Sequence, residues 1–84
     1  MTSATGDTTT HYHWEFQRSR DGLWAHHAAD PRGTDRSHCT PEGFARQVLG
    51  VHTPDHQPWR LAVWDRPGVG AEPVYTITSD QARK

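Results

Sequence analysis

The sequence predicts a small α+β domain with one main helix packed on one face of a four-stranded antiparallel sheet, in the order ββαββ. Three observations lead to this prediction. Apolar and polar side chains alternate with period two in residues 12–17, and aromatic and aliphatic residues alternate with others in residues 59–64. Between these segments, Thr40-Pro41 is a helix start signal, and an apolar stripe with helical spacing follows it.

The first two strands are predicted to form a hairpin from residues 11–17 and 23–29, and two registers are open. A two-residue turn at Asp21-Gly22 places Trp24 on the polar face. A three-residue loop that begins at Arg20 places Trp24 with the aromatic residues. We prefer the three-residue loop because it buries the indole and puts Gly22 where a positive φ is needed.

Residues 30–39 are rich in turn-forming residues and predict an irregular connection. The helix then begins with Thr40 as N-cap and Pro41 in its first position. It ends before Pro54, because proline disfavours helical geometry in the residue that precedes it. The stripe expected to pack on the sheet consists of Phe44, Val48 and Val51, flanked by Ala45 and Leu49.

Residues 59–65 predict the third strand, a turn region covers residues 66–70, and residues 74–78 predict the fourth strand. A short helix can start at Ser79. Within the third strand, Trp59, Leu61 and Val63 share one face and Arg60, Ala62 and Trp64 share the other. Because a single helix cannot cover both faces of the sheet, we expect one face to be partly open, with aromatic residues such as Trp64 exposed on it.

The composition bounds the class of protein. Residues 1–10 are almost entirely small and polar, which predicts a disordered tail before a single domain of residues 11–84. The net charge of −1 favours neither a nucleic acid nor a membrane as partner. The single cysteine and the lack of an early apolar run predict a cytoplasmic location. The excess of arginine over lysine and the absence of asparagine are typical of a GC-rich bacterial genome.

Histidines and the cysteine raise the question of a metal site. His11 and His13 share a strand face, and the preferred hairpin register puts Glu15 opposite His27, which would make a set of zinc ligands. We interpret this set as a polar surface. The spacing of Cys39, His52 and His56 matches half of a zinc finger, but the other cysteine is missing and Pro54 interrupts the helix. We therefore assign no cofactor and no metal site.

Cys39 also precedes the helix N-terminus, where the helix dipole can lower the pKa of a thiol. No orienting carboxylate or oxyanion motif accompanies it, and the neighbouring His38 is poorly placed to act as a base. We interpret Cys39 as a small apolar residue that packs against Phe44 in a hydrophobic staple.

Arginines near the first hairpin suggest a nucleic-acid surface made of Arg18, Arg20, Arg32 and Arg36. Within residues 22–33, Gly22-Leu23-Trp24-Ala25 and Asp30-Pro31-Arg32-Gly33 are faintly similar to the sheet of the plant-type AP2 DNA-binding domain. The third strand of that domain is not expected before the helix here. The resemblance implies DNA binding, whereas four acidic residues among these arginines cancel their charge.

A small sheet with an uncovered aromatic face and free edges suits partner binding best. The sequence therefore predicts a non-enzymatic binding or accessory module that acts on a protein partner or as a homodimer. A nucleic-acid-binding module is the second hypothesis, and a metal-dependent or cysteine-based activity is the third. The residues expected to form the partner surface are Trp24, Trp64, Arg18 and Arg60.

Overall fold

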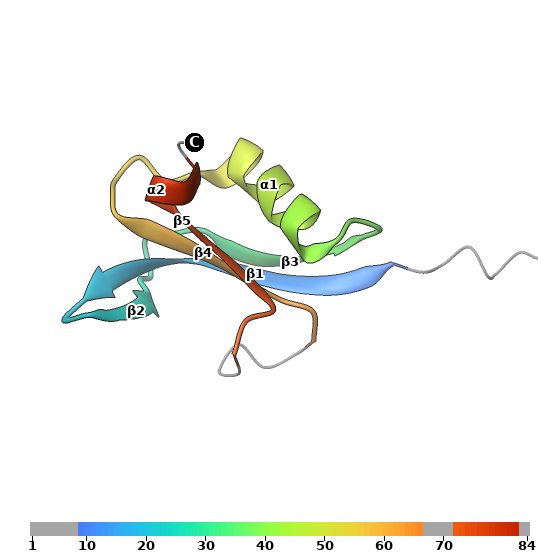
Figure 1. Ribbon diagram of the computed structural model, residues 1–84, viewed down its shortest axis with the longest axis horizontal. Coiled ribbons are helices and arrows are strands. Elements are labelled where there is room, and N and C mark those ends of the chain that lie inside the picture. The colour runs from blue at the N-terminus through green and yellow to red at the C-terminus, as the bar shows by residue number, and fades with distance from the viewer. Residues whose placement is uncertain (1–8, 67–71, 83–84) are drawn as a thin grey trace, which may run out of the picture.

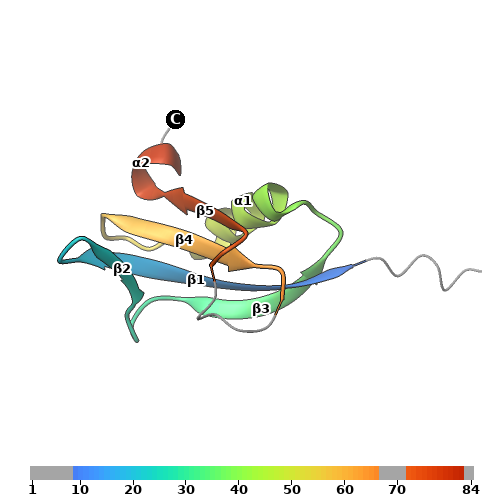
Figure 2. The ribbon, with the colours of Figure 1, turned by 60° about the horizontal axis from the view of Figure 1, so that its bottom comes forward.

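The computed structural model describes residues 9–66 and 72–82, and it shows an α+β domain with a five-stranded antiparallel sheet and one main helix (Figure 1). The sheet order is β2-β1-β4-β5, and β3 also pairs with β1. Figure 2 shows the sheet from the side that α1 does not cover. The elements are β1 (Thr10–Arg20), β2 (Leu23–His26), β3 (Arg32–Ser37), α1 (Pro41–His52), β4 (Trp59–Trp64), β5 (Tyr75–Thr78) and α2 (Ser79–Ala82).

The prediction of four strands was wrong, because residues 32–37 form β3 where an irregular connection was expected. The cause is the length of β1, which has 11 residues and extends well past β2. The first half of β1 pairs with β3, from Thr10↔Ser37 to Glu15↔Arg32. This pairing satisfies backbone groups of β1 that β2 does not reach.

The predicted tail and the predicted turn lie partly outside the residues that the structure describes. Thr10 belongs to β1, although it was assigned to the disordered tail. The remainder of that tail up to Thr8, and residues 67–70 of the predicted turn, lie outside the described residues. Neither helix of the described part is long and apolar enough to cross a membrane.

The preferred hairpin register was wrong, because the structure has the two-residue turn. Ser19 lies opposite Trp24 and Arg20 opposite Leu23. Asp21 and Gly22 both have a positive φ, of 54° and 82°, as a type I′ turn requires. A type I′ turn matches the twist of the two strands, and this favours the observed register more than burial of the indole favours the alternative. Trp24 therefore lies on the polar side. β2 ends at His26, earlier than predicted.

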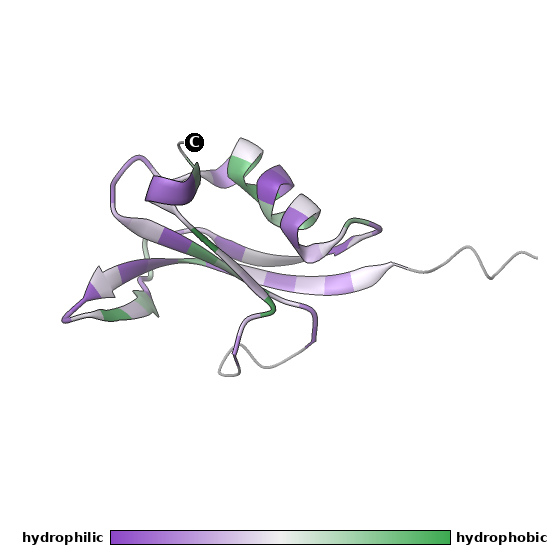
Figure 3. Ribbon diagram, viewed as in Figure 1, coloured by the Kyte–Doolittle hydropathy of each residue, from purple (hydrophilic) through white to green (hydrophobic). Residues whose placement is uncertain are grey.

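The helix was predicted correctly at both ends. The Thr40 side chain accepts a hydrogen bond from the Gly43 amide at 3.1 Å, Pro41 follows it, and α1 ends at His52. Hydrophobic and hydrophilic residues alternate along α1 (Figure 3), and Phe44, Ala45 and Val48 are buried. The inclusion of Val51 in the packed stripe was wrong, since Val51 is 75% exposed.

The core lies between α1 and the sheet. Its buried side chains come from every second residue of β1 and β4, from α1 and from β5, and Figure 1 shows α1 over this face. The Tyr12 ring stacks on Phe44 with centroids 4.5 Å apart, and Phe16 meets Trp59 edge-on at 5.3 Å. The core consists of Tyr12, Trp14, Phe16, Phe44, Ala45, Val48, Trp59, Leu61, Val63 and Ile77.

The expectation that Trp64 is exposed was wrong. Its register opposite His13 places it on the sheet face away from α1, yet it is only 2% exposed, and Ala62 on the same face is fully buried. An indole buries about 150–250 Å², which strongly favours its removal from water on either side of a sheet. The side of the sheet away from α1 is therefore exposed over β2 and β3 but buried at Ala62 and Trp64 of β4.

Candidate partner-binding surface

We call the side of the sheet that α1 does not cover the open face. The strand registers assign its residues, because side chains on paired positions point to the same side. Three arginines belong to the open face, together with three histidines. Its only carboxylate within the strands is Glu15, which is 6% exposed. The cationic and imidazole residues of the open face are His11, His13, His26, Arg32, Arg36 and Arg60.

A hydrogen-bonded network crosses the centre of the open face. The Gln17 side-chain amide donates to Glu15 at 2.8 Å. The side-chain Oε1 of Gln17 accepts from Arg60 Nε at 2.9 Å and from Arg60 Nη2 at 2.6 Å. The Arg60 guanidinium also lies 5.6 Å from the centre of the Trp24 ring, within cation–π range. Burial lowers the pKa of Arg60, while the charge of Glu15 opposes that shift.

Arg32 and Arg36 differ from Arg60 because their charges are free. Both are exposed and project from β3 to the open face, opposite Glu15 and His11 respectively. Within residues 9–66 and 72–82, neither forms a salt bridge. A partner's carboxylate can therefore approach both without displacing an existing ion pair.

Two polar atoms at the junction of β1 and β3 are buried without a hydrogen-bond partner in the described part of the chain. They are His13 Nε2 and Trp14 Nε1. The Trp14 ring packs against Gly33, where an added Cβ would lie 3.1 Å from Cζ2. A buried polar atom without a partner costs about 1–3 kcal/mol. Both atoms make this junction less well satisfied than the β1–β4 junction.

Arg18 lies on the side of β1 opposite to the open face, and Asp30 lies in the connection between β2 and β3. Arg18 donates to the two Asp30 oxygens at 2.8 and 3.0 Å, and His56 Nε2 lies 2.8 Å from Oδ1. The hydrogen bond from Arg18 is the main reason that the pKa of Asp30 falls to about 2, with His56 contributing in the same direction and burial opposing it. The same bond raises the pKa of Arg18.

An Asp–His pair can orient an imidazole for general-base catalysis, but such a site also needs a nucleophile or a substrate pocket at the imidazole. Among the described residues, no serine, threonine or cysteine side chain is hydrogen-bonded to His56. The contacts of Asp30 instead join β1 to the β2–β3 connection and to the α1–β4 connection. We interpret the cluster as a structural junction.

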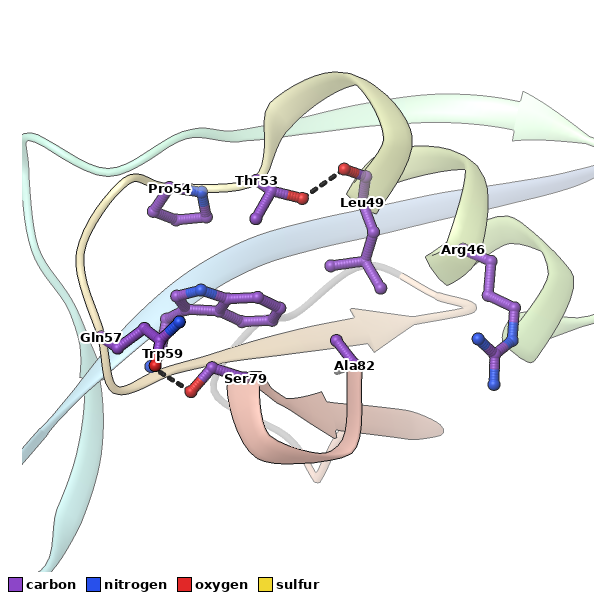
Figure 4. A pocket seen from close by; sticks show the side chains of 8 residues that line it. All are labelled: Arg46, Leu49, Thr53, Pro54, Gln57, Trp59, Ser79 and Ala82. Carbon is purple, nitrogen blue, oxygen red and sulfur yellow. Dashed lines mark hydrogen bonds between the residues drawn. The ribbon is translucent and has the colours of Figure 1, made fainter. Parts of the chain in front are cut away.

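A pocket of about 420 Å³ lies between α1 and α2 (Figure 4). The Trp59 indole forms its base, and the Trp59 amide donates to Ser79 at 3.3 Å. Arg46 is its only charged lining residue, and it pairs with Glu42 on the same helix. The pocket therefore lacks an acid–base pair. Its lining residues are Arg46, Leu49, Thr53, Pro54, Gln57, Trp59, Ser79 and Ala82.

The preferred hairpin register would have brought His11, His13, Glu15 and His27 together as zinc ligands, and the structure does not have this arrangement. Glu15 lies opposite Arg32 and Ala62, so its expected position opposite His27 was wrong. The His11 and His13 rings are neighbours, 5.0 Å apart. No group of three metal-ligating side chains is found in residues 9–66 and 72–82.

Cys39 is half-buried and packs against the core. The Gln47 side chain donates to its sulfur at 3.3 Å, and its carbonyl accepts from the Tyr12 hydroxyl at 2.6 Å. These contacts give Cys39 a structural role at the start of α1.

The structure brings together only part of each predicted residue set. Trp24 and Arg60 meet on the open face, whereas Trp64 is buried and Arg18 is bound to Asp30. Of the predicted nucleic-acid set, Arg32 and Arg36 share the open face, and Arg20 lies at the hairpin tip. Sequence analysis missed the roles of Glu15 and Gln17. Their position on the polar side of an aromatic strand was the available signal.

Comparison with models of known protein families, with curated proteins and with solved structures gives no match in any of the three.

Proposed function

We propose that this domain is a non-enzymatic binding module whose open face binds an acidic segment of a protein partner. The observation that supports the proposal most is the separation of charge between the two sides of β3. Arg32 and Arg36 project to the open face without an ion pair in the described chain, while Asp35 lies on the opposite side. Arginine and tryptophan are the residues most enriched at binding hot spots, and Trp24 lies on the same face.

The overall charge favours a protein over a nucleic acid as the partner. Polyanion-binding domains usually carry a net positive charge that attracts the polymer from a distance. This chain has a net charge of −1, so its attraction for an anion depends on local groups of arginines such as Arg32 and Arg36 on the open face. A short segment with a few carboxylates matches a patch of this size.

The proposal can be tested with poly-L-glutamate as the acidic probe, using the intrinsic tryptophan fluorescence of the full chain. Arg32→Glu and Arg36→Glu should each weaken binding about fivefold, which corresponds to about 1 kcal/mol. The matched control is Arg46→Glu, because Arg46 is exposed on α1, away from the open face. Its binding should stay within about twofold of the wild type. Equal losses in all three variants would mean that only the net charge matters, and no binding at all would contradict the proposal.

Single-stranded nucleic acid is the second candidate, and the pairing of Trp24 with Arg60 favours it. A half-buried indole beneath a guanidinium is suited to base stacking. Binding of oligothymidylate that exceeds binding of poly-L-glutamate at equal salt, and that is lost in Trp24→Ala, would establish this alternative.

A homodimer is the third possibility for the same surface, because β2, β3 and β5 each pair with only one described strand. Size-exclusion chromatography with light scattering at several concentrations measures it directly. If the dimer persists in Arg32→Glu and Arg36→Glu, the open face is not the surface through which the chain self-associates.

A further inference from the structure

We infer that the acidic partner segment binds as an additional strand on the free edge of β3 and places its alternate apolar side chains in the groove between β3 and α1. This inference rests on the proposed function and specifies how the partner is held. Strand addition of this kind obtains affinity from main-chain hydrogen bonds and specificity from pockets for alternate side chains.

The free edge follows from the hydrogen bonds of β3. Within the described chain β3 pairs with β1 alone. The Phe16 amide donates to the Pro31 carbonyl at 3.1 Å, one position beyond the β1–β3 register. Bonded pairs alternate in an antiparallel ladder, so Gly33 and Asp35 direct their backbone groups to β1. The backbone N–H and C=O groups that point outward belong to Arg32, Thr34 and Arg36.

The groove supplies an apolar wall. It has a volume of about 310 Å³ and separates β3 from α1. Val51 forms part of this wall and is 75% exposed, although it continues the apolar stripe of the helix. An aliphatic side chain placed against Val51 would remove both from water. The residues that line the groove include Asp35, Arg36, Gln47, Val48, Val51 and His52.

The two sides of an added strand would meet different environments. Successive side chains of a strand point to opposite faces. On the open face, the neighbours of the added strand would be Arg32 and Arg36, which favour Glu or Asp. On the other side, the neighbours would be Val51 and Val48. The matching segment therefore alternates acidic and aliphatic residues. Asp35, which also lines the groove, favours a single basic or neutral residue near its position.

The inference can be tested with two blocked peptides of about six residues, a length typical of a strand. In one peptide Glu alternates with Val, and in the other the same residues are grouped by type. The alternating peptide should bind the full chain at least about tenfold more tightly, equivalent to about 1.4 kcal/mol. It should also slow hydrogen exchange of the Thr34 and Arg36 amides, which NMR measures residue by residue.

Variants of the chain distinguish the contribution of the apolar groove to peptide binding from the effect of an added negative charge. Val51→Asp should reduce binding of the alternating peptide about tenfold, because it places a carboxylate in the apolar wall. Gly50→Asp is the matched control: it adds the same charge at the neighbouring exposed position, where an added Cβ meets nothing within 4 Å. Its effect should stay within about twofold. Thr34→Pro should abolish binding, since it removes an outward donor at an edge position where proline is tolerated.

The outcomes distinguish this inference from the proposed function. If the grouped and alternating peptides bind equally, with equal losses in Val51→Asp and Gly50→Asp, the open face binds acid but the strand-addition mode is wrong. If neither peptide nor poly-L-glutamate binds, both ideas fail. If Thr34→Pro does not fold, the alternating peptide N-methylated on the edge that faces β3 replaces it and should not bind. If a second copy of the chain protects the same amides in a dimer, the inferred occupant is wrong.

Discussion

Both faces of the sheet bury strand positions, but the buried residues differ in kind. Under α1, β1 and β4 contribute aromatic and aliphatic side chains that touch no water and need no hydrogen bonds, such as Phe16 and Leu61. On the open face, β4 buries Ala62 and Trp64, whereas β1 buries the polar pair Glu15 and Gln17, which depend on hydrogen bonds to each other and to Arg60. Burial on the first face is non-directional, whereas burial of the polar pair on the second depends on every polar partner being present.

Because of this difference, the face of the sheet on which a residue lies does not by itself predict whether its side chain is exposed and can bind a partner. Trp64 and Arg32 both lie on the open face, yet one is buried and the other is exposed. The position of each strand in the sheet makes the distinction. β4 is an inner strand and β3 is an edge strand. β3 therefore has both exposed side chains and backbone groups that can bind a partner.

The largest expected effect comes from the helix-covered face. Phe16→Ala should lower the free energy of unfolding by about 3–5 kcal/mol, because Phe16 is fully buried and packs edge-on against Trp14 and Trp59. For a domain of this size, such a loss approaches the whole stability. Urea unfolding followed by circular dichroism measures it. Ser19→Ala, an exposed position on the same strand, is the control, and a loss below about 1 kcal/mol for Phe16→Ala would contradict the packing described.

The next largest effect tests the open face. Gln17→Ala should cost about 2–3 kcal/mol, since it removes the acceptor of Arg60 and the donor to Glu15 and leaves both charged groups without their partner. Gln17→Glu retains the acceptor for Arg60 but places a second carboxylate beside Glu15. Its cost should therefore depend strongly on pH, unlike that of Gln17→Ala. The urea midpoints of both variants, measured at about pH 5 and about pH 8, test this difference in pH dependence.

Several parts of the fold follow from local signals in the sequence, and these are the parts that were predicted correctly. The boundaries of α1 depend on Thr40, Pro41 and Pro54, whose effects act within one turn of the helix. Strands β1 and β4 follow from period-two alternation. Each of these signals is contained in the segment that it describes.

The errors concern features that depend on distant residues. β3 contains Gly33 and Asp35, which are uncommon in strands, and it forms because β1 offers it an unpaired edge. The hairpin register was decided by the φ angles of Asp21 and Gly22 instead of by the burial of Trp24. Arg32 and Arg36 were named in the predicted nucleic-acid set, but their shared face and the free edge of β3 could not be found from the sequence because the strand itself was not predicted.

A smaller effect is expected at Asp30, in the connection between β2 and β3. The pKa of Asp30 is about 2 in the folded chain, below its usual value of 3.8, so the unfolded chain binds the proton more readily. The resulting stabilisation, about 2 kcal/mol, is present above about pH 4 and is lost as the pH falls towards 2. Asp30→Asn should be less stable by about this amount at pH 7 and should lose the acid dependence in this window. Urea titrations at several pH values test it, and parallel pH profiles for both proteins would contradict the role of Asp30.

The smallest expected effect concerns Val51, which belongs to the apolar stripe of α1 but lies beyond the area that the sheet covers. Val51→Ser should change the free energy of unfolding by less than about 0.5 kcal/mol, because the side chain is already 75% exposed. Val48→Ser, one turn earlier and 5% exposed, should cost several times more. If Val51→Ser proves as costly as Val48→Ser, Val51 is covered in the folded chain and the groove beside β3 is closed. A negligible cost, together with loss of alternating-peptide binding, would show that Val51 serves the partner instead of the fold.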